Sequence, residues 1–134
     1  MERIVLIIAL LFSVMLSAQN WSKTYDDALA VSSKENKPIL LVFSGSDWCG
    51  PCIKLDKEIW KSNEFSSYSA KVVLYKADFP RKKDNKLPES LAKSNAMLAE
   101  KFNPNGFFPL VVLLDKNQKV LGQTGYKKCP LQII

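Results

Sequence analysis

Two cysteines separated by two residues, Cys49 and Cys52, follow an apolar run at residues 39–43 and precede a helix-compatible stretch at residues 53–60. This order predicts a strand, a tight turn and a helix that carries both thiols on its first turn. Positions three apart on a helix share one face, and a modest backbone adjustment would let the two sulfurs bond. The pair can therefore store two electrons.

The start of a helix also favours thiol chemistry. Its first turn has unpaired N–H groups and a partial positive charge, which stabilise a thiolate. We therefore expect Cys49 to be the more acidic thiol, because thiols so placed have pKa values of roughly 3.5–7.5 instead of about 8.5. Its thiolate would attack a substrate disulfide, and Cys52 would resolve the mixed disulfide by attacking the sulfur just joined.

Three other roles compete for the cysteine pair: a structural disulfide, half of a zinc site, or two inert buried thiols. A bridge across two residues constrains the unfolded chain very little. A closed zinc site needs four ligands, and the chain has no histidine and only one other cysteine, Cys129. Zinc would thus require acidic or intermolecular ligands, and we expect no metal.

At these residues the chain resembles the thioredoxin superfamily. Trp48-Cys49-Gly50-Pro51-Cys52 after a buried strand is similar to that family's active site, and residues 106–115 resemble its cis-proline followed by a central strand. The resemblance spans about residues 21–126. It implies a thiol-disulfide oxidoreductase without a dissociable cofactor.

The same resemblance implies how the substrate is held. Trp48, Gly50 and Pro51 would contact it from the dithiol turn, and Phe108 and Pro109 would do so from across the site. It also implies a cis Phe108–Pro109 bond, with Pro109 packed beside the two cysteines.

One position departs from the family. Many thioredoxins place a buried aspartate six residues before the first cysteine, where this chain has Phe43. Deprotonation of Cys52 would then depend on water, the substrate or another carboxylate such as Asp47, although Asp47 is most simply an exposed turn residue.

The first residues predict a secretory signal. An apolar run at residues 4–16 follows Glu2-Arg3 and ends at Ser17-Ala18, shorter than the roughly 20 residues that span a bilayer. We expect cleavage after Ala18, which leaves one domain at residues 19–134, exported to a periplasm or the exterior. An uncleaved membrane anchor is the alternative, because Leu16 is not ideal at the third position before the cut.

The basic residues do not have the pattern of a nucleic-acid-binding surface. The formal net charge is +6, and its main cluster is Arg81-Lys82-Lys83 with Lys86. No aromatic residues are interleaved with it as a nucleic-acid platform would need. We interpret the cluster as a solvated loop, with weak attraction to acidic partners or an anionic membrane as the alternative.

The remaining pattern predicts an α/β fold of thioredoxin type, a mixed sheet with the strand before the dithiol near its middle and helices on both faces. The expected helices are residues 21–36, capped by Ser22, residues 49–63 and residues 88–102; the expected strands are residues 38–44, 71–78, 110–114 and 119–124.

The end of the sequence differs from the family, whose final helix follows the hairpin. Residues 125–134 contain Pro130 and leave too few positions for a stable helix. We therefore expect a domain that lacks this helix and is marginally stable or completed by another chain. Cys129 would be an unpaired thiol, open to intermolecular bridging.

Together these features predict an exported reductase or isomerase of protein disulfides, since Gly50-Pro51 resembles reducing thioredoxins. A membrane-bound thiol-disulfide partner would have to supply its electrons. The alternative is a redox-weak binding or chaperone-like module that holds client peptides in the groove around Trp48, Phe108 and Pro109.

Overall fold

The computed structural model describes residues 19–126. The predicted signal at residues 1–18 and the tail from residue 127, with Cys129, lie outside them. The helices are α2 (Tyr25–Glu35), α3 (Gly50–Leu55), a π-helical turn (Asp56–Trp60), α4 (Asn63–Ser69), a 3₁₀ turn (Lys83–Asn85) and α5 (Glu89–Phe102). The strands are β1 (Ile39–Ser44), β2 (Val73–Asp78), β3 (Leu110–Leu114) and β4 (Val120–Gly125).

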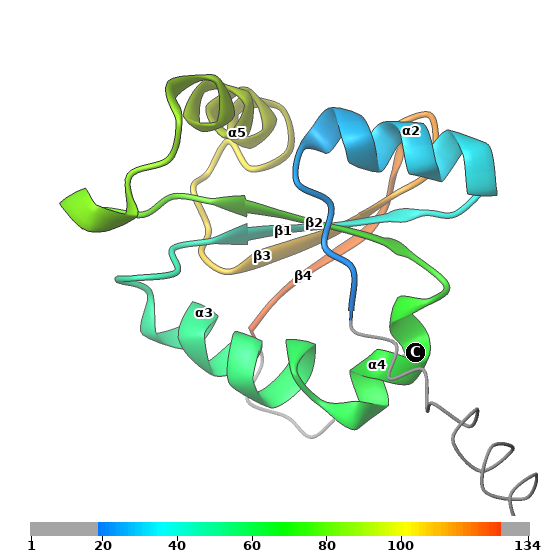
Figure 1. Cartoon of the computed structure of the whole chain (residues 1–134), viewed down its shortest axis with the longest axis horizontal. Coiled ribbons are helices and arrows are strands. Elements are labelled where there is room, and N and C mark those ends of the chain that lie inside the picture. Colours follow the sequence, from blue (N-terminus) through cyan, green and yellow to red (C-terminus); the bar gives the residue numbers. More distant parts are fainter. Residues whose placement is uncertain (1–18, 127–134) are drawn as a thin grey trace, which may run out of the picture.

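The sheet has the strand order β2-β1-β3-β4. β1 pairs in parallel with β2 and antiparallel with β3, which in turn forms an antiparallel hairpin with β4. Figure 1 shows α2 and α5 on one face of the sheet and α3 and α4 on the other. The predicted mixed sheet, with β1 inside it and helices on both faces, is confirmed.

The unbroken apolar run of β1 supplies a core on each face. Successive side chains of a strand point to opposite faces. Ile39, Leu41 and Phe43 join the cluster beneath α2 and α5, whereas Val42 joins Leu55 and other side chains of the opposite cluster. This double burial fixes β1 and therefore the position of the dithiol turn at its carboxyl end.

The first predicted helix begins too early. Trp21 forms a parallel bridge with Leu74, and the Ser22 N–H donates to the Leu74 carbonyl at 2.8 Å. Thr24, not Ser22, caps α2, because its hydroxyl accepts from the Asp27 N–H at 3.1 Å. The apolar spacing of Trp21 matched a helix, but its ring packs edge-on against Trp60 at 5.8 Å instead.

The predicted helix at residues 49–63 is also interrupted. α3 passes into the π-helical turn, and a separate helix, α4, begins after Ser62, whose hydroxyl accepts from the Phe65 N–H at 3.1 Å. The short α4 places Phe65 against Trp60, with ring centroids 4.7 Å apart. Between residues 19 and 126, no helix combines the length and apolar character that crossing a membrane requires.

Candidate active site

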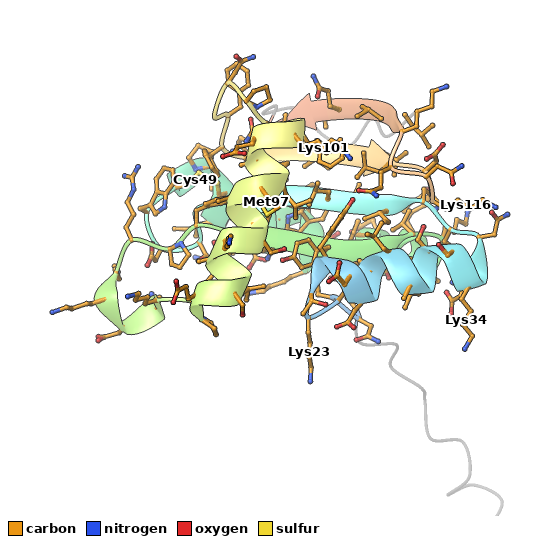
Figure 2. All side chains as sticks on the ribbon, turned by 90° about the horizontal axis from the view of Figure 1, so that it is seen from above. Lys23, Lys34, Cys49, Met97, Lys101 and Lys116 are labelled. Atoms are coloured by element: carbon orange, nitrogen blue, oxygen red, sulfur yellow. A yellow bond between two sulfur atoms is a disulfide. The ribbon has the colours of Figure 1, made fainter. Side chains whose placement is uncertain are left out.

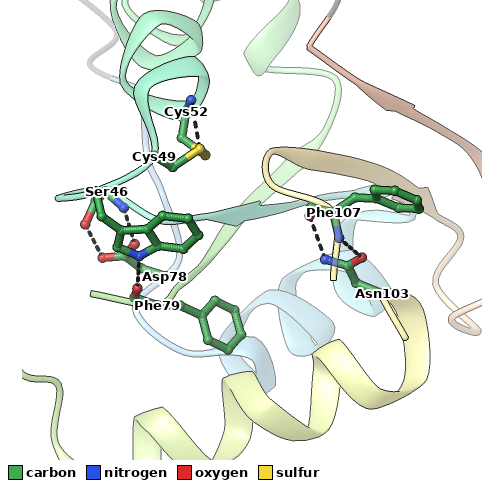
Figure 3. The surroundings of a disulfide bond; sticks show 8 residues. Ser46, Cys49, Cys52, Asp78, Phe79, Asn103 and Phe107 are labelled. Atoms are coloured by element: carbon green, nitrogen blue, oxygen red, sulfur yellow. Dashed lines mark hydrogen bonds between the residues drawn. A yellow bond between two sulfur atoms is a disulfide. The ribbon is translucent and has the colours of Figure 1, made fainter. Parts of the chain in front are cut away.

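Cys49 and Cys52 form a disulfide at the start of α3 (Figure 3). Their Cα atoms are 5.2 Å apart. Cys49 is the N-cap residue, and its Sγ accepts a hydrogen bond from the Cys52 N–H at 3.3 Å. Both cysteines are buried, whereas Gly50 and Pro51 between them are exposed. An N–H donor aimed at Sγ of Cys49 would stabilise negative charge on that sulfur once the disulfide is reduced.

The turn before the dithiol is held by its neighbours. The Gly45 carbonyl accepts from the Cys49 N–H at 2.9 Å. The Ser46 N–H and hydroxyl donate to the two carboxylate oxygens of Asp78 at 3.0 and 2.5 Å. Asp78 ends β2, so the strand beside β1 fixes the entry to the active-site turn (Figure 3).

The side chain of Trp48 is locked in place. Its Nε1–H donates to the Phe79 carbonyl at 2.7 Å. Its ring lies so close to Gly45 that a Cβ at this glycine would be 2.3 Å from Cε2 of Trp48. Real contacts between carbon atoms lie near 3.5–4.0 Å, so only glycine fits at position 45.

Aromatic rings continue from Trp48 into the core. Phe108 meets Trp48 edge-on at 5.4 Å, Phe79 meets Phe108 at 5.4 Å, and Phe79 stacks on Phe43 at 6.5 Å. Phe43 is fully buried among these groups. The position that carries an aspartate in many thioredoxins thus supplies apolar packing here and cannot accept a proton.

Asp47 is more than the exposed turn residue that the sequence predicted. Its carboxylate accepts from the Arg81 and Lys82 N–H groups, both at 2.9 Å, and from Nδ2 of Asn85 at 3.1 Å. These hydrogen bonds, the Arg81 N–H first, hold the pKa of Asp47 below its usual range. Both oxygens therefore serve the loop at residues 79–87, which argues against Asp47 as the proton acceptor for Cys52.

The predicted cis peptide bond between Phe108 and Pro109 is confirmed. The segment before it is clamped by Asn103, a buried residue at the end of α5. Nδ2 of Asn103 donates to the Phe107 carbonyl at 2.8 Å, and its Oδ1 accepts from the Phe107 N–H at 2.9 Å (Figure 3). This clamp leaves the Phe107 side chain 61% exposed.

A pocket of about 380 Å³ connects the dithiol turn with this segment. Its lining is largely apolar and comes from the start of α3, the cis-proline segment and the end of β4: Pro51, Phe107, Phe108, Pro109, Leu110, Gly125 and Tyr126. Pro109 thus faces the same pocket as Pro51, the residue between the cysteines. An extended apolar peptide segment could lie there beside the dithiol.

Comparison with known proteins agrees with this geometry. A sequence profile described as thioredoxin-like matches residues 20–116. The chain belongs to the thioredoxin-like family. It is 36% identical over 106 residues to the disulfide bond reductase DsbH of Chlamydia pneumoniae, covering 78% of this chain and 62% of that protein. It is 32% identical to the thioredoxin-related protein DsbJ of the same organism, covering 78% of this chain and 30% of that protein.

Solved structures of the family show the same fold. A DsbH oxidoreductase superposes with a TM-score of 0.75 at 34% identity, covering 82% of this chain and 74% of that one. A thioredoxin from Thermus thermophilus superposes with a TM-score of 0.58 at 17% identity, covering 80% and 75%. The chain spans less than two thirds of the length of the two Chlamydia proteins that it matches.

The structure places the predicted site residues on two segments. Trp48, Cys49, Gly50, Pro51 and Cys52 share the β1–α3 turn, and Phe108 and Pro109 approach it from the start of β3. Sequence reasoning missed the residues that support them: Gly45, Asp78, Phe79, Asn103 and Phe107. Gly45 lies in the Gly-Ser-Asp turn before the dithiol and Phe107 lies within residues 106–115, the segment that resembles the cis-proline region, whereas the other three had no local signal.

Proposed function

We propose that this chain reduces disulfide bonds of protein substrates, with Cys49 as the nucleophile and Cys52 as the resolving thiol. One observation carries the proposal: Cys49 caps α3 with its own sulfur, which accepts the Cys52 N–H. A thiolate on Cys49 gains from this donor and from the partial positive charge of the helix terminus. The similarity to a protein named a disulfide bond reductase supports the same activity.

The reaction conserves atoms and electrons. The Cys49 thiolate attacks one sulfur of a substrate disulfide, forms a mixed disulfide and releases the other substrate sulfur as a thiolate. Cys52, deprotonated by water or by the departing thiolate, then attacks Sγ of Cys49 and releases the second substrate thiol. Two electrons pass to the substrate, and the chain is left with the Cys49–Cys52 disulfide.

The pocket beside the dithiol would hold the substrate. Phe107, Phe108 and Pro109 present an apolar edge next to Pro51, and Trp48 packs edge-on against Phe108. Because hydrogen bonds fix Trp48 and the Phe107 backbone, little backbone ordering is needed there when a peptide binds.

The proposal also covers where the chain acts and which protein re-reduces its dithiol. The apolar segment at residues 4–16 supports export, so the chain would act in a periplasm or outside the cell. Each turnover oxidises the dithiol, and a membrane-bound thiol-disulfide protein would return two electrons to it. No nucleic-acid partner is proposed.

Trapping tests the assignment of the two thiols. Cys52→Ser should accumulate mixed disulfides through Cys49, because the resolving thiol is gone, and Cys49→Ser should accumulate none. Mass spectrometry locates the bond. A substrate trapped on Cys52 in the Cys49→Ser variant would reverse the roles.

Turnover separates the reductase from the alternative, a redox-weak binding module. With a dithiol as electron source, the wild-type chain should reduce insulin catalytically, and Cys49→Ser should lose that activity. A binding module would hold clients without turnover and would tolerate Cys49→Ser.

A further inference from the structure

The loop at residues 79–87 brings an arginine to the active-site tryptophan. The guanidinium carbon of Arg81 lies 3.7 Å from the centroid of the Trp48 ring, and Trp48 directly precedes Cys49. A cation over an aromatic face is attracted by the ring. Since Trp48 is itself held by the Phe79 carbonyl, the Arg81 head group has a defined place over the tryptophan of the dithiol turn.

The backbone on both sides of Arg81 is fixed as well. Asp47 binds the Arg81 and Lys82 N–H groups and the Asn85 side chain, and the Lys83–Asn85 turn follows. The chain therefore holds this loop against the dithiol turn at four points, counting the hydrogen bond from Trp48 to Phe79.

Within residues 19–126, the Arg81 guanidinium lies over the Trp48 ring but pairs with no carboxylate. Residues 19–126 contain three ion pairs, Lys37–Glu35, Lys61–Asp56 and Lys76–Asp56, and the loop takes part in none of them. Arg81 is exposed, and within the same residues only its backbone N–H, not its guanidinium, donates a hydrogen bond to another side chain. A planar guanidinium with its donors free matches the two oxygens of a carboxylate.

Nearby charges set the distance over which Arg81 attracts an acidic group. Exposed Lys82, Lys83 and Lys86 add to Arg81, but the carboxylates of Asp47, Asp78 and Asp84 lie in the same region. Four cations against three carboxylates give only a weak field at a distance, so attraction would act at contact range.

We propose that Arg81 is a carboxylate-binding subsite beside the dithiol, through which the chain selects disulfides flanked by an acidic side chain. This inference rests on the proposed function and adds a substrate class to it. Pocket and subsite lie on different elements, the Phe107–Pro109 segment and the 79–87 loop. A substrate would thus offer an apolar residue to the first and an acidic one to the second.

Matched peptides test the selectivity. Two peptides with the same disulfide differ only in Glu or Gln near the cysteine, and the readout is the ratio of their kcat/KM values. We expect the Glu peptide to react roughly two- to fivefold faster, the effect of one exposed ion pair. The ratio should fall toward one at about 0.5 M salt, where screening shortens to a few ångströms.

Variants at one position separate charge from structure. Arg81→Gln should bring the ratio of the two kcat/KM values to one, and Arg81→Lys should keep part of the preference for Glu. Arg81→Glu should favour a third peptide, which has Lys at the same position. Lys34→Gln is the control with the same charge change, since Lys34 is exposed and lies at the far end of the sheet from Cys49 (Figure 2). Its ratio should equal that of the wild type. A ratio unaffected by Arg81→Glu would overturn the subsite.

A binding measurement keeps this test independent of catalysis. Calorimetry of the oxidised protein with peptides in which serine replaces cysteine should show the same preference for Glu over Gln. Preference in binding without any reduction would support the subsite and refute the proposed function. Reduction without preference would refute the subsite alone. Arg81-dependent sedimentation with phosphatidylserine vesicles, without peptide preference, would assign the loop to a membrane and also overturn it.

Discussion

Replacing Gly45 with alanine should disrupt the active-site turn through Trp48. The new Cβ would lie 2.3 Å from Cε2, 2.5 Å from Cζ2 and 2.6 Å from Nε1 of Trp48. A ring at an ordinary contact distance would have to move by roughly 1 Å. That shift breaks the Nε1–H bond to Phe79, now 2.7 Å long, and the edge contact with Phe108.

The size of the effect follows from these losses. The hydrogen bond contributes about 0.5–1.5 kcal/mol and the ring contact a similar amount. Alanine has less conformational freedom than glycine in the unfolded chain, and this difference offsets about 0.4–1 kcal/mol of the loss. We therefore expect the free energy of unfolding of Gly45→Ala to fall by about 1.3 kcal/mol, the centre of a range that reaches about 2.6 kcal/mol. Urea denaturation of the oxidised protein, followed by far-ultraviolet circular dichroism, measures this loss.

The matched control is Gly50→Ala in the same turn, because a Cβ at Gly50 meets nothing within 4 Å. Gly50 begins α3, and alanine is favoured over glycine in helices by roughly 0.5–1 kcal/mol. Gly50→Ala should therefore be as stable as the wild type or slightly more so. If Gly45→Ala and Gly50→Ala were equally stable, the account of Trp48 as a ring wedged against Gly45 would be wrong.

Three further predictions concern the support around the site. Tyr75 donates to Oδ1 of buried Asn95 at 2.5 Å. Tyr75→Phe should lower the free energy of unfolding by about 1–2 kcal/mol and Asn95→Leu by about 2–3 kcal/mol, measured by denaturation. Additive losses in the double variant would disprove coupling between the two residues. The pKa of Asp47 is lowered in the folded protein. Its hydrogen bonds to residues 79–87 should therefore be complete above about pH 4 and lost as pH falls through that lowered pKa. The NMR shifts of the loop amides in an acid titration measure this, and a midpoint above pH 4 would contradict it. Phe107→Ala should raise KM several-fold and leave kcat and stability nearly unchanged, because the ring is 61% exposed at the pocket; a loss in kcat alone would exclude a role in binding.

Local patterns predicted the parts of the fold whose causes are local. The apolar run at residues 39–43 predicted a strand inside the sheet, and the strands expected at residues 110–114 and 119–124 pair as the β3–β4 hairpin. Asp115 accepts from the Asn117 and Lys119 N–H groups and closes the turn between these two strands. In the dithiol segment, strand, turn and helix follow each other directly, so the Cys49–Cys52 pair was visible in the sequence.

The rest depends on contacts between residues far apart in the chain. Asp47 and Arg81, or Ser46 and Asp78, are separated by more than 30 residues, and no periodicity reports such a pair. Trp21 has helical spacing, but its backbone bridges to Leu74 because β2 offers an open edge there. The side chains that support the dithiol turn were therefore missed, although the sequence predicted the cysteine pair itself.

The reduction potential of the Cys49–Cys52 pair tests the central claim most directly. Gly50-Pro51 lies between the cysteines, as in reducing thioredoxins, and a related protein is named a disulfide bond reductase. Equilibration with glutathione, read by mass spectrometry after alkylation, gives the potential. We predict a value more negative than about −180 mV, the value of protein disulfide isomerase. A value near −120 mV, that of a strong oxidant, would contradict a reductase.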